Sequence, residues 1–226
     1  MLSELSGSLA HELNQPLAII LSNAQAAQRL MAQEPPDLAE VRDILADIVS
    51  EDERAGEVIR RMRAMLKPGE TKLQPLVVTE VIEEVLHLVN SDLISRSVVV
   101  HRRFTPDVPR VLGEHIQLQQ VLLNLILNAC DAMDANPPTD RRLTLATEHR
   151  NGMVCASVSD NGCGLPPEVE RVFEPFHTTK KDGLGLGLSI CRTIVGVHQG
   201  RLRAESNEAK GATFHLELPA VKEAHA

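Results

Sequence analysis

The chain of 226 residues is long enough for one larger domain or two small domains, and its 43% of hydrophobic residues is typical of a chain that folds. Its formal net charge of −8 argues against nucleic acid as the main partner, and no apolar run approaches the roughly 20 residues of a membrane-spanning helix. The four cysteines lack paired spacing, which favours reduced thiols in a cytoplasmic protein over a disulfide framework or a zinc site.

Residues 1 to about 32 are rich in Leu, Ala, Ile and Gln and are predicted to form one helix. Within this helix, the stretch 8–17 crowds His11, Glu12, Asn14 and Gln15 into about one and a half turns. A helix that only packs has no use for this group, but a His-Glu pair alone is most often a polar patch on a solvated face. The pair therefore needs support from the rest of the chain.

A second helix is predicted after the stop signal at residues 34–37, where two prolines precede Asp37, a residue suited to cap the next helix. Apolar residues then recur in alternating steps of three and four, which is a heptad seam with one polar break. The seam consists of Leu38, Val41, Leu45, Ile48, Asp52, Ala55, Ile59 and Met62. Because one antiparallel hairpin cannot cover the apolar seams of both helices, we expect a homodimer that closes a four-helix bundle.

The pattern changes after residue 70 to shorter strands and helices. The predicted strands span 73–78, 97–104, 110–112, 142–150, 153–159, 201–206 and 212–218, and the predicted helices span 79–93, 114–133 and 188–198. Thr79 is the expected N-cap of the first of these helices, and Asn151-Gly152 is a strong hairpin signal. The expected fold class is α+β, with a helical dimerisation domain at 1–67, a linker at 68–72, an α+β domain at 73–220 and a tail at 221–226.

The predicted helix 114–133 carries a polar row on its otherwise apolar sequence. Asn124, Asn128 and Asp131 recur at steps of four and three, so they share one face of the helix. Amide oxygens are neutral hard ligands suited to Mg²⁺, which usually keeps waters and shares the phosphates of a substrate. Taken alone, the row is equally what a solvated amphipathic helix would show.

Two glycine-containing segments follow. Asp160 ends a predicted strand and precedes Gly162 and Gly164; its carboxylate suits the amino group of an adenine, although a plain Asn-Gly turn would look the same. The segment 182–189 alternates glycine with other residues and runs into a helix, which makes an anion site because free amides and the helix dipole point at the ligand. It lacks the Gly-Lys-Ser/Thr of a Walker loop. Between the two segments, residues 173–180 combine two phenylalanines with hydroxyl groups and Lys180.

In their order and spacing, these segments closely resemble the catalytic core of sensor histidine kinases of two-component systems. Five sequence motifs of this family follow one another in family order over nearly the whole chain. They are the His box at 8–17, the Asn box at 120–132, the first glycine box at 160–164, the Phe box at 173–180 and the second glycine box at 182–189. The resemblance implies a dimerisation and phosphotransfer domain, followed by a Bergerat-type α/β sandwich of the GHKL superfamily that binds ATP.

The resemblance also implies residue roles. It makes His11 the residue phosphorylated by ATP, Glu12 its acid–base partner, and Asn128 the ligand of Mg²⁺. Asp160 matches the carboxylate that recognises adenine. The residues expected to bind the nucleotide are Asn124, Asn128, Asp131, Asp160, Gly162, Gly164, Phe176, Thr178, Thr179, Lys180, Gly183, Leu184, Gly185, Leu186 and Gly187.

The chain departs from the commonest His box at Asn14, where the family usually has Arg, and at Gln15, where it usually has Thr or Asn. The role in doubt is that of Gln15. That position usually helps to orient water when a response regulator is dephosphorylated, so Gln15 is the candidate for this role and the phosphatase activity stays open. The receiver domain of a response regulator is the expected partner. Because Met1 lies only about three turns before His11, we expect a longer natural protein whose upstream sensor region could be membrane-bound. The alternatives are a GHKL-type ATPase clamp and a catalytically inactive, nucleotide-binding dimeric scaffold.

Overall fold

The structure is a computed structural model that describes residues 2–32, 37–49, 51–52, 73–178 and 185–221. For residues 2–16 it describes the backbone of a helix and not the side chains. The chain divides into two compact units, Met1–Gly69 and Glu70–Ala226. Among the described residues, no helix is long and apolar enough to cross a membrane.

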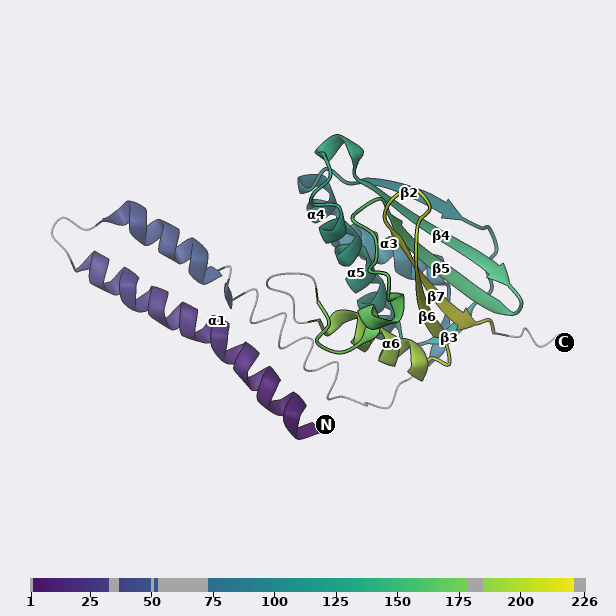
Figure 1. Cartoon of the computed structure of the whole chain (residues 1–226), viewed down its shortest axis with the longest axis horizontal. Helices are drawn as coiled ribbons and strands as arrows, with labels where there is room; N and C mark the ends of the chain where they lie inside the picture. Colours follow the sequence, from purple (N-terminus) through teal and green to yellow (C-terminus); the bar gives the residue numbers. More distant parts are fainter. Residues whose placement is uncertain (1, 33–36, 50, 53–72, 179–184, 222–226) are drawn as a thin grey trace. The chain divides into compact units, whose positions relative to one another are not determined.

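The first unit is helical, as predicted. Helix α1 spans Leu2–Met31, and residues 38–49 form a second helical segment (Figure 1). Asp37 caps this segment, because its Oδ1 accepts hydrogen bonds from the backbone N–H groups of Ala39 and Glu40 at 3.2 and 3.1 Å. The predicted cap is therefore confirmed.

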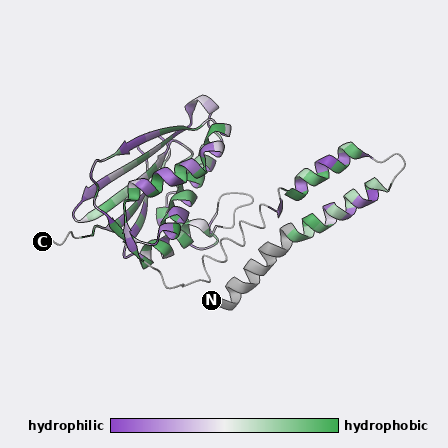
Figure 2. Cartoon of the chain, turned by 180° about the vertical axis from the view of Figure 1, so that it is seen from behind, coloured by the Kyte–Doolittle hydropathy of each residue, from purple (hydrophilic) through white to green (hydrophobic). Residues whose placement is uncertain are grey.

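Hydrophobic residues recur along the second helical segment (Figure 2). Val41 is buried, but Leu38 and Leu45 of the same predicted seam are 65% and 52% exposed in the single chain. An exposed apolar row on a helix indicates a surface that another helix covers. The last three seam positions, Ala55, Ile59 and Met62, lie outside the described residues, and the predicted homodimer stays a proposal.

The second unit contains a five-stranded sheet in the order β2-β4-β5-β7-β6, in which β2 and β4 are parallel and the other neighbours are antiparallel. Its strands are β2 Val99–Phe104, β4 Arg142–Arg150, β5 Met153–Asp160, β6 Arg201–Ser206 and β7 Ala212–Pro219. A separate antiparallel pair joins β1 Gln74–Leu76 to β3 Val111–Gly113. The turn at Asn151-Gly152 between β4 and β5 has positive φ at both residues, which confirms the predicted hairpin.

Helices cover one face of this sheet (Figure 1). The α-helices are α3 Val78–Leu88, α4 Asn90–Ser95, α5 His115–Ala132 and α6 Gly187–Val197, and single 3₁₀ turns are η1 Pro138–Asp140 and η2 Val169–Phe173. Along β5, Val154, Ala156 and Val158 are buried under the helices, while the intervening residues are half-buried on the open face. The α+β fold class is confirmed, with the core between one layer of helices and one sheet.

Two details of the prediction around residues 79–93 are wrong. The N-cap of α3 is Val77 and not Thr79; burial of Val78 starts the helix one residue earlier, and the Thr79 hydroxyl lies 3.4 Å from that of Thr147 on β4. The predicted single helix is also divided at Val89 into α3 and α4. A β-branched valine followed by Asn90 and Ser91 is a run of low helix propensity, which explains the break.

Candidate functional site

Helix α5 positions the polar row predicted from the sequence. The Glu114 carboxylate caps the helix by accepting hydrogen bonds from the backbone N–H groups of Ile116 and Gln117 at 3.2 and 2.7 Å. The buried side of α5 consists of Leu118, Val121, Leu122, Leu125, Ile126, Ala129 and Cys130. Asn124 and Asn128 are therefore half-buried on another side, where Asn128 Nδ2 donates to Asn124 Oδ1 at 3.3 Å. The prediction that these two asparagines share a face is confirmed.

The first turn of α6 lies against Asn124. A Cβ atom on Gly187 would be 2.7 Å from Asn124 Nδ2 and 2.8 Å from its Oδ1, which is closer than van der Waals contact. Asn124 Nδ2 also donates to the sulfur of Cys191 on α6 at 3.0 Å. Glycine at 187 is thus required for the close approach of α5 and α6. The approach brings the amino end of α6, which favours anions, next to the two asparagines.

Asp160 lies at the end of β5, and its side chain is turned into the protein. The residue is 4% exposed, and its Oδ1 accepts a hydrogen bond from the backbone N–H of Gly162 at 2.7 Å. Burial raises the pKa of Asp160, although backbone hydrogen bonds from Gly162 and Ala212 partly oppose the rise. A buried carboxylate oxygen is a strong acceptor for an exocyclic amino group such as that of adenine.

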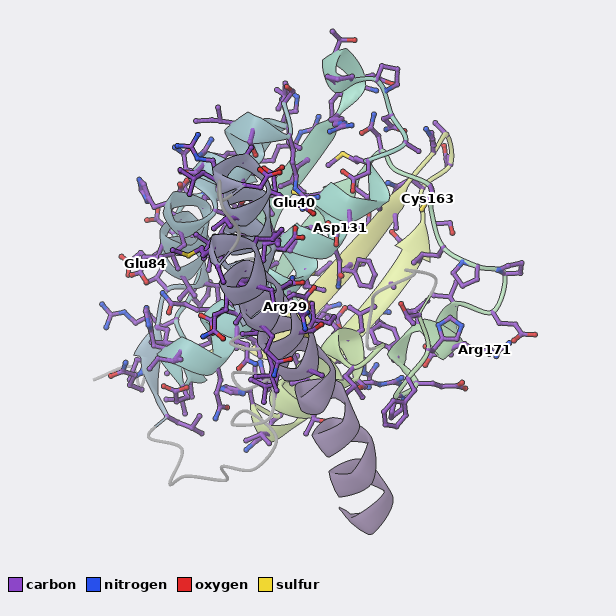
Figure 3. The ribbon with its side chains drawn as sticks, turned by 90° about the vertical axis from the view of Figure 1, so that its left-hand side faces the viewer. Arg29, Glu40, Glu84, Asp131, Cys163 and Arg171 are labelled. Carbon is purple, nitrogen blue, oxygen red and sulfur yellow. The ribbon has the colours of Figure 1, made fainter. Side chains whose placement is uncertain are left out.

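The loop after Asp160 is fixed to the carboxyl end of α5. The backbone N–H of Cys163 donates to the carbonyl of Ala132 at 3.0 Å, and a Cβ atom on Gly162 would lie 2.4 Å from the same oxygen. Figure 3 labels Cys163 in this loop and Asp131 on α5. Glycine at 162 therefore allows a backbone contact that no larger residue permits. It links the predicted adenine carboxylate to the asparagine helix.

The segment between the two glycine boxes has an apolar anchor. Phe173 is buried against Phe214, with ring centroids 6.3 Å apart at 82°, and the Arg192 guanidinium lies 5.0 Å from its centroid. Phe176 is 48% exposed and has a positive φ; its N–H donates to the carbonyl of Gly185 at 3.0 Å. This bond ties the predicted Phe box to the second glycine box.

Asp131, the third member of the polar row, forms an ion pair that the sequence analysis did not anticipate. Arg96 Nη1 lies 2.7 Å from Asp131 Oδ1 and 3.4 Å from Asp134 Oδ1. Desolvation lowers the pKa of Arg96, but the bond to Asp131 and the charge of Asp134 outweigh it, so the net pKa is raised. The guanidinium thus offsets the charge of these two carboxylates at the carboxyl end of α5.

Several predicted site residues are not brought into this cluster by the described part of the chain. Four of them lie outside the described residues: Thr179, Lys180, Gly183 and Leu184. On either side of these, Thr178 is exposed and Leu186 is buried. Gly164 has a positive φ in the loop after Asp160. His11, Glu12 and Gln15 belong to α1 of the first unit, where the backbone alone is described.

Three residues that sequence reasoning missed join the elements of the site. Two of them are Arg96 and Cys191, described above, and the third is His198. The His198 side chain is buried, with 3% of the residue exposed, and its Nε2 accepts a hydrogen bond from the Glu114 N–H at 2.9 Å. His198 Nδ1 lies 2.8 Å from the carbonyl of Ile194, so the ring ties the end of α6 to the start of α5. A histidine in an apolar helix segment was the available signal for this role, but it did not reveal the partner.

The donor set fits a nucleoside triphosphate with its magnesium ion. Asn124 and Asn128 offer neutral amide groups beside the amino end of α6, which favours anions. Mg²⁺ prefers oxygen ligands and binds them together with phosphates and water. Asp160 offers a buried acceptor beside the carboxyl end of α5, where the loop that follows it is bonded to Ala132. The arrangement can therefore hold a base at one end and phosphates at the other.

Two family models match the chain. The model described as histidine kinase-, DNA gyrase B-, and HSP90-like ATPase matches residues 113–222. The model described as the His kinase A (phospho-acceptor) domain matches residues 1–70. The match to the His kinase A model ends at residue 70, where the two compact units meet.

The individual proteins that the chain resembles are sensor proteins and histidine kinases. The chain is 37% identical over 224 residues to the sensor protein FixL of Bradyrhizobium diazoefficiens, which covers 98% of this chain and 44% of FixL. It is 32% identical to the catalytic domain of histidine kinase ThkA, with a TM-score of 0.59, covering 66% of this chain and 95% of that one. A structure of ThkA in complex with the response regulator protein TrrA matches at 26% identity with a TM-score of 0.76, covering 97% of this chain and 62% of that one. The chain spans less than half the length of the curated relatives it matches.

Proposed function

This chain belongs to the histidine kinases of two-component systems, and we propose that it phosphorylates its own His11 with ATP and passes the phosphoryl group to an aspartate of a response regulator. Residues 1–67 serve as the dimerisation and phosphotransfer domain and residues 73–220 as the ATP-binding domain. Both family matches and the two compact units support this division.

The observation that carries the proposal is the meeting of separate motifs around α5. Asn124 contacts Gly187 of α6, and the loop after Asp160 is hydrogen-bonded to the carboxyl end of α5. In the proposed complex, Asp160 accepts a hydrogen bond from the adenine amino group, and the amino end of α6 faces the phosphates. Asn128 is the proposed ligand of Mg²⁺, which when bound offsets the negative charge of the phosphates.

The proposed reaction is a phosphoryl transfer from ATP to an imidazole. The lone pair of one ring nitrogen of neutral His11 forms a bond to the γ-phosphorus, and the bond from that phosphorus to the β,γ-bridging oxygen breaks, which releases ADP. Glu12 accepts a hydrogen bond from the proton on the other ring nitrogen and stabilises the imidazolium as it forms. The phosphoryl group then moves to an aspartate oxygen of the receiver domain, and His11 is regenerated.

The proposed partners are a second copy of this chain and a response-regulator receiver domain. Exposed Leu38 and Leu45 support the homodimer, because a second hairpin would bury their side chains. The similarity to ThkA, whose structure was solved with a response regulator protein, supports the second partner. The proposed location is the cytoplasm, where free thiols persist, and all four cysteines are free.

His11→Gln tests the assignment of the phosphorylated residue. With radiolabelled Mg-ATP, the wild-type chain is expected to gain an acid-labile label, while His11→Gln gains none and still binds a fluorescent ATP analogue. A label of equal size on His11→Gln would contradict the assignment. An ATPase clamp or an inactive scaffold would give no acid-labile label on the wild-type chain, so the same experiment separates these alternatives.

Gln15 is the proposed residue that orients water when the phosphorylated regulator is hydrolysed. The assay measures loss of phosphate from a pre-phosphorylated receiver domain in the presence of the wild-type chain or Gln15→Ala. The substitution is expected to slow dephosphorylation and leave autophosphorylation of His11 unchanged. Equal rates of dephosphorylation for the two proteins would remove Gln15 from this role.

A further inference from the structure

We propose that Cys191 is a positioning residue, whose buried sulfur fixes the orientation of the Asn124 amide and, through it, that of Asn128. Cys191 lies on α6, one turn after Gly187, and is 1% exposed. The inference rests on the proposed nucleotide site, because it concerns the direction in which the Asn128 oxygen is presented. Cys191 itself touches neither the nucleotide nor the metal ion.

The sulfur of Cys191 has two partners on α5. It accepts a hydrogen bond from Asn124 Nδ2 at 3.0 Å, and it donates its own hydrogen toward the carbonyl of Val121 at 3.9 Å. Burial raises the pKa of Cys191 to about 12, although the bond from Asn124 opposes the rise. The thiol therefore keeps its hydrogen at neutral pH, and its lone pairs remain the acceptor that faces Asn124.

This arrangement selects one of the two orientations of the Asn124 amide. In the observed orientation the amide donates to the sulfur and accepts from Asn128 Nδ2 at 3.3 Å. After a flip, the nitrogens of Asn124 and Asn128 would face each other as two donors, and the thiol would have to leave Val121 to reach Asn124 Oδ1. The sulfur thus discriminates against the flipped amide.

The orientation of Asn124 contributes to that of Asn128 in turn. Because Asn128 uses its nitrogen to donate to Asn124, its oxygen Oδ1 lies on the opposite side of the amide, away from Asn124. An amide presents a metal ion with its oxygen and not with its nitrogen. Gly187, on the same helix as Cys191, leaves the space that the Asn124 amide occupies, since a Cβ atom there would overlap it. The sulfur, Asn124 and Asn128 therefore form one relay that ends on the proposed magnesium ligand.

Two substitutions at Cys191 separate this role from simple packing. Cys191→Val keeps an apolar side chain but removes both the acceptor and the donor, whereas Cys191→Ser keeps both in a smaller side chain. The dissociation constant of a fluorescent ATP analogue is measured for the full chain with Mg²⁺ and with a chelator. Loss of one positioning hydrogen bond is expected to weaken binding in Mg²⁺ by about threefold to tenfold in Cys191→Val, and by less in the chelator. Cys191→Ser is expected to restore wild-type binding to within about twofold.

Cys130→Val is the matched control, because Cys130 is equally buried at 1% and lies on α5 without taking part in the relay. It is expected to bind the analogue as the wild-type chain does in both conditions. Cys191→Val binding as tightly as the wild type in Mg²⁺, or Cys191→Ser binding as weakly as Cys191→Val at an unchanged unfolding temperature, would overturn the proposal.

A second measurement needs neither nucleotide nor activity. The side-chain amide NMR signals of Asn124 in the free protein are expected to shift and broaden in Cys191→Val and to return in Cys191→Ser. Unchanged Asn124 signals in Cys191→Val would overturn the positioning role, whatever the binding data show. If the wild-type chain does not bind the analogue at all, the proposed function fails, and these signals still decide the role of Cys191.

Discussion

Replacing Gly187 by alanine tests the contact between α5 and α6 at the centre of the site. The new Cβ would lie 2.7 Å from Asn124 Nδ2 and 3.1 Å from its Cγ, so the Asn124 amide has to rotate away. It then loses its hydrogen bonds to Cys191 and from Asn128, at about 1 kcal/mol each. Gly187 is the first residue of α6, where alanine lacks the advantage that it has in a helix interior, so the free energy of unfolding falls by about 2 kcal/mol.

The same displacement is expected to weaken nucleotide binding, because the Asn124 amide lies in the proposed phosphate site. The affinity for a fluorescent ATP analogue in Mg²⁺ is expected to fall about tenfold or more, which corresponds to about 1.4 kcal/mol. Binding is followed by fluorescence titration, and stability by thermal unfolding of the same samples.

Gly196→Ala provides the control on the same helix. No atom lies within 4 Å of the position that its Cβ would take, and the residue is exposed. This variant is expected to be more stable by about 0.5–1 kcal/mol and to bind the analogue like the wild-type chain. Equal affinities of Gly187→Ala and Gly196→Ala for the analogue would contradict a role of the Asn124 amide in binding.

Asp160→Asn is expected to weaken binding of the analogue about tenfold or more, because a charged acceptor for the adenine is lost. Since burial raises the pKa of Asp160 above 3.8, the folded chain holds this proton more tightly than the unfolded chain, and the charged carboxylate lowers stability as pH rises. The unfolding temperature of Asp160→Asn should therefore exceed that of the wild type at neutral pH and approach it near pH 3.8; the reverse order would contradict this. Asn128→Ala should abolish the Mg²⁺ dependence of nucleotide binding, and an unchanged dependence would remove Asn128 from the metal role. Leu45→Glu should shift the chain from dimer to monomer in sedimentation, whereas an unchanged dimer would place the seam elsewhere.

Local patterns predicted most of the second unit. The hairpin of β4 and β5 follows from alternating residues around Asn151-Gly152, and α5 follows from a periodic apolar stripe that begins after Glu114. The error at Thr79 has a different origin, because burial of Val78 and the contact with Thr147 on β4 override the preference of threonine for a cap. Boundaries thus depend on packing that the local sequence does not contain.

Within the site, too, local spacing predicts some contacts, and packing between distant segments determines the others. Asn124 and Asn128 could be paired from their spacing, because neighbours at a step of four always meet on a helix. The contacts of Asn124 with Cys191, of Asp131 with Arg96 and of Glu114 with His198 join residues 67, 35 and 84 positions apart. No local pattern encodes such contacts, since they depend on how α5 packs against α6 and against the end of α4.

The proposed function requires that His11 receives the phosphoryl group of ATP. The most direct test is mass spectrometry of the full chain after incubation with Mg-ATP, using neutral or basic conditions that preserve phosphohistidine. Because the chain contains nine histidines, the measurement discriminates among many candidate acceptors. Phosphate is expected on the peptide that contains His11 and on no other histidine peptide. Phosphate on another residue, or none while the nucleotide is bound, would contradict it.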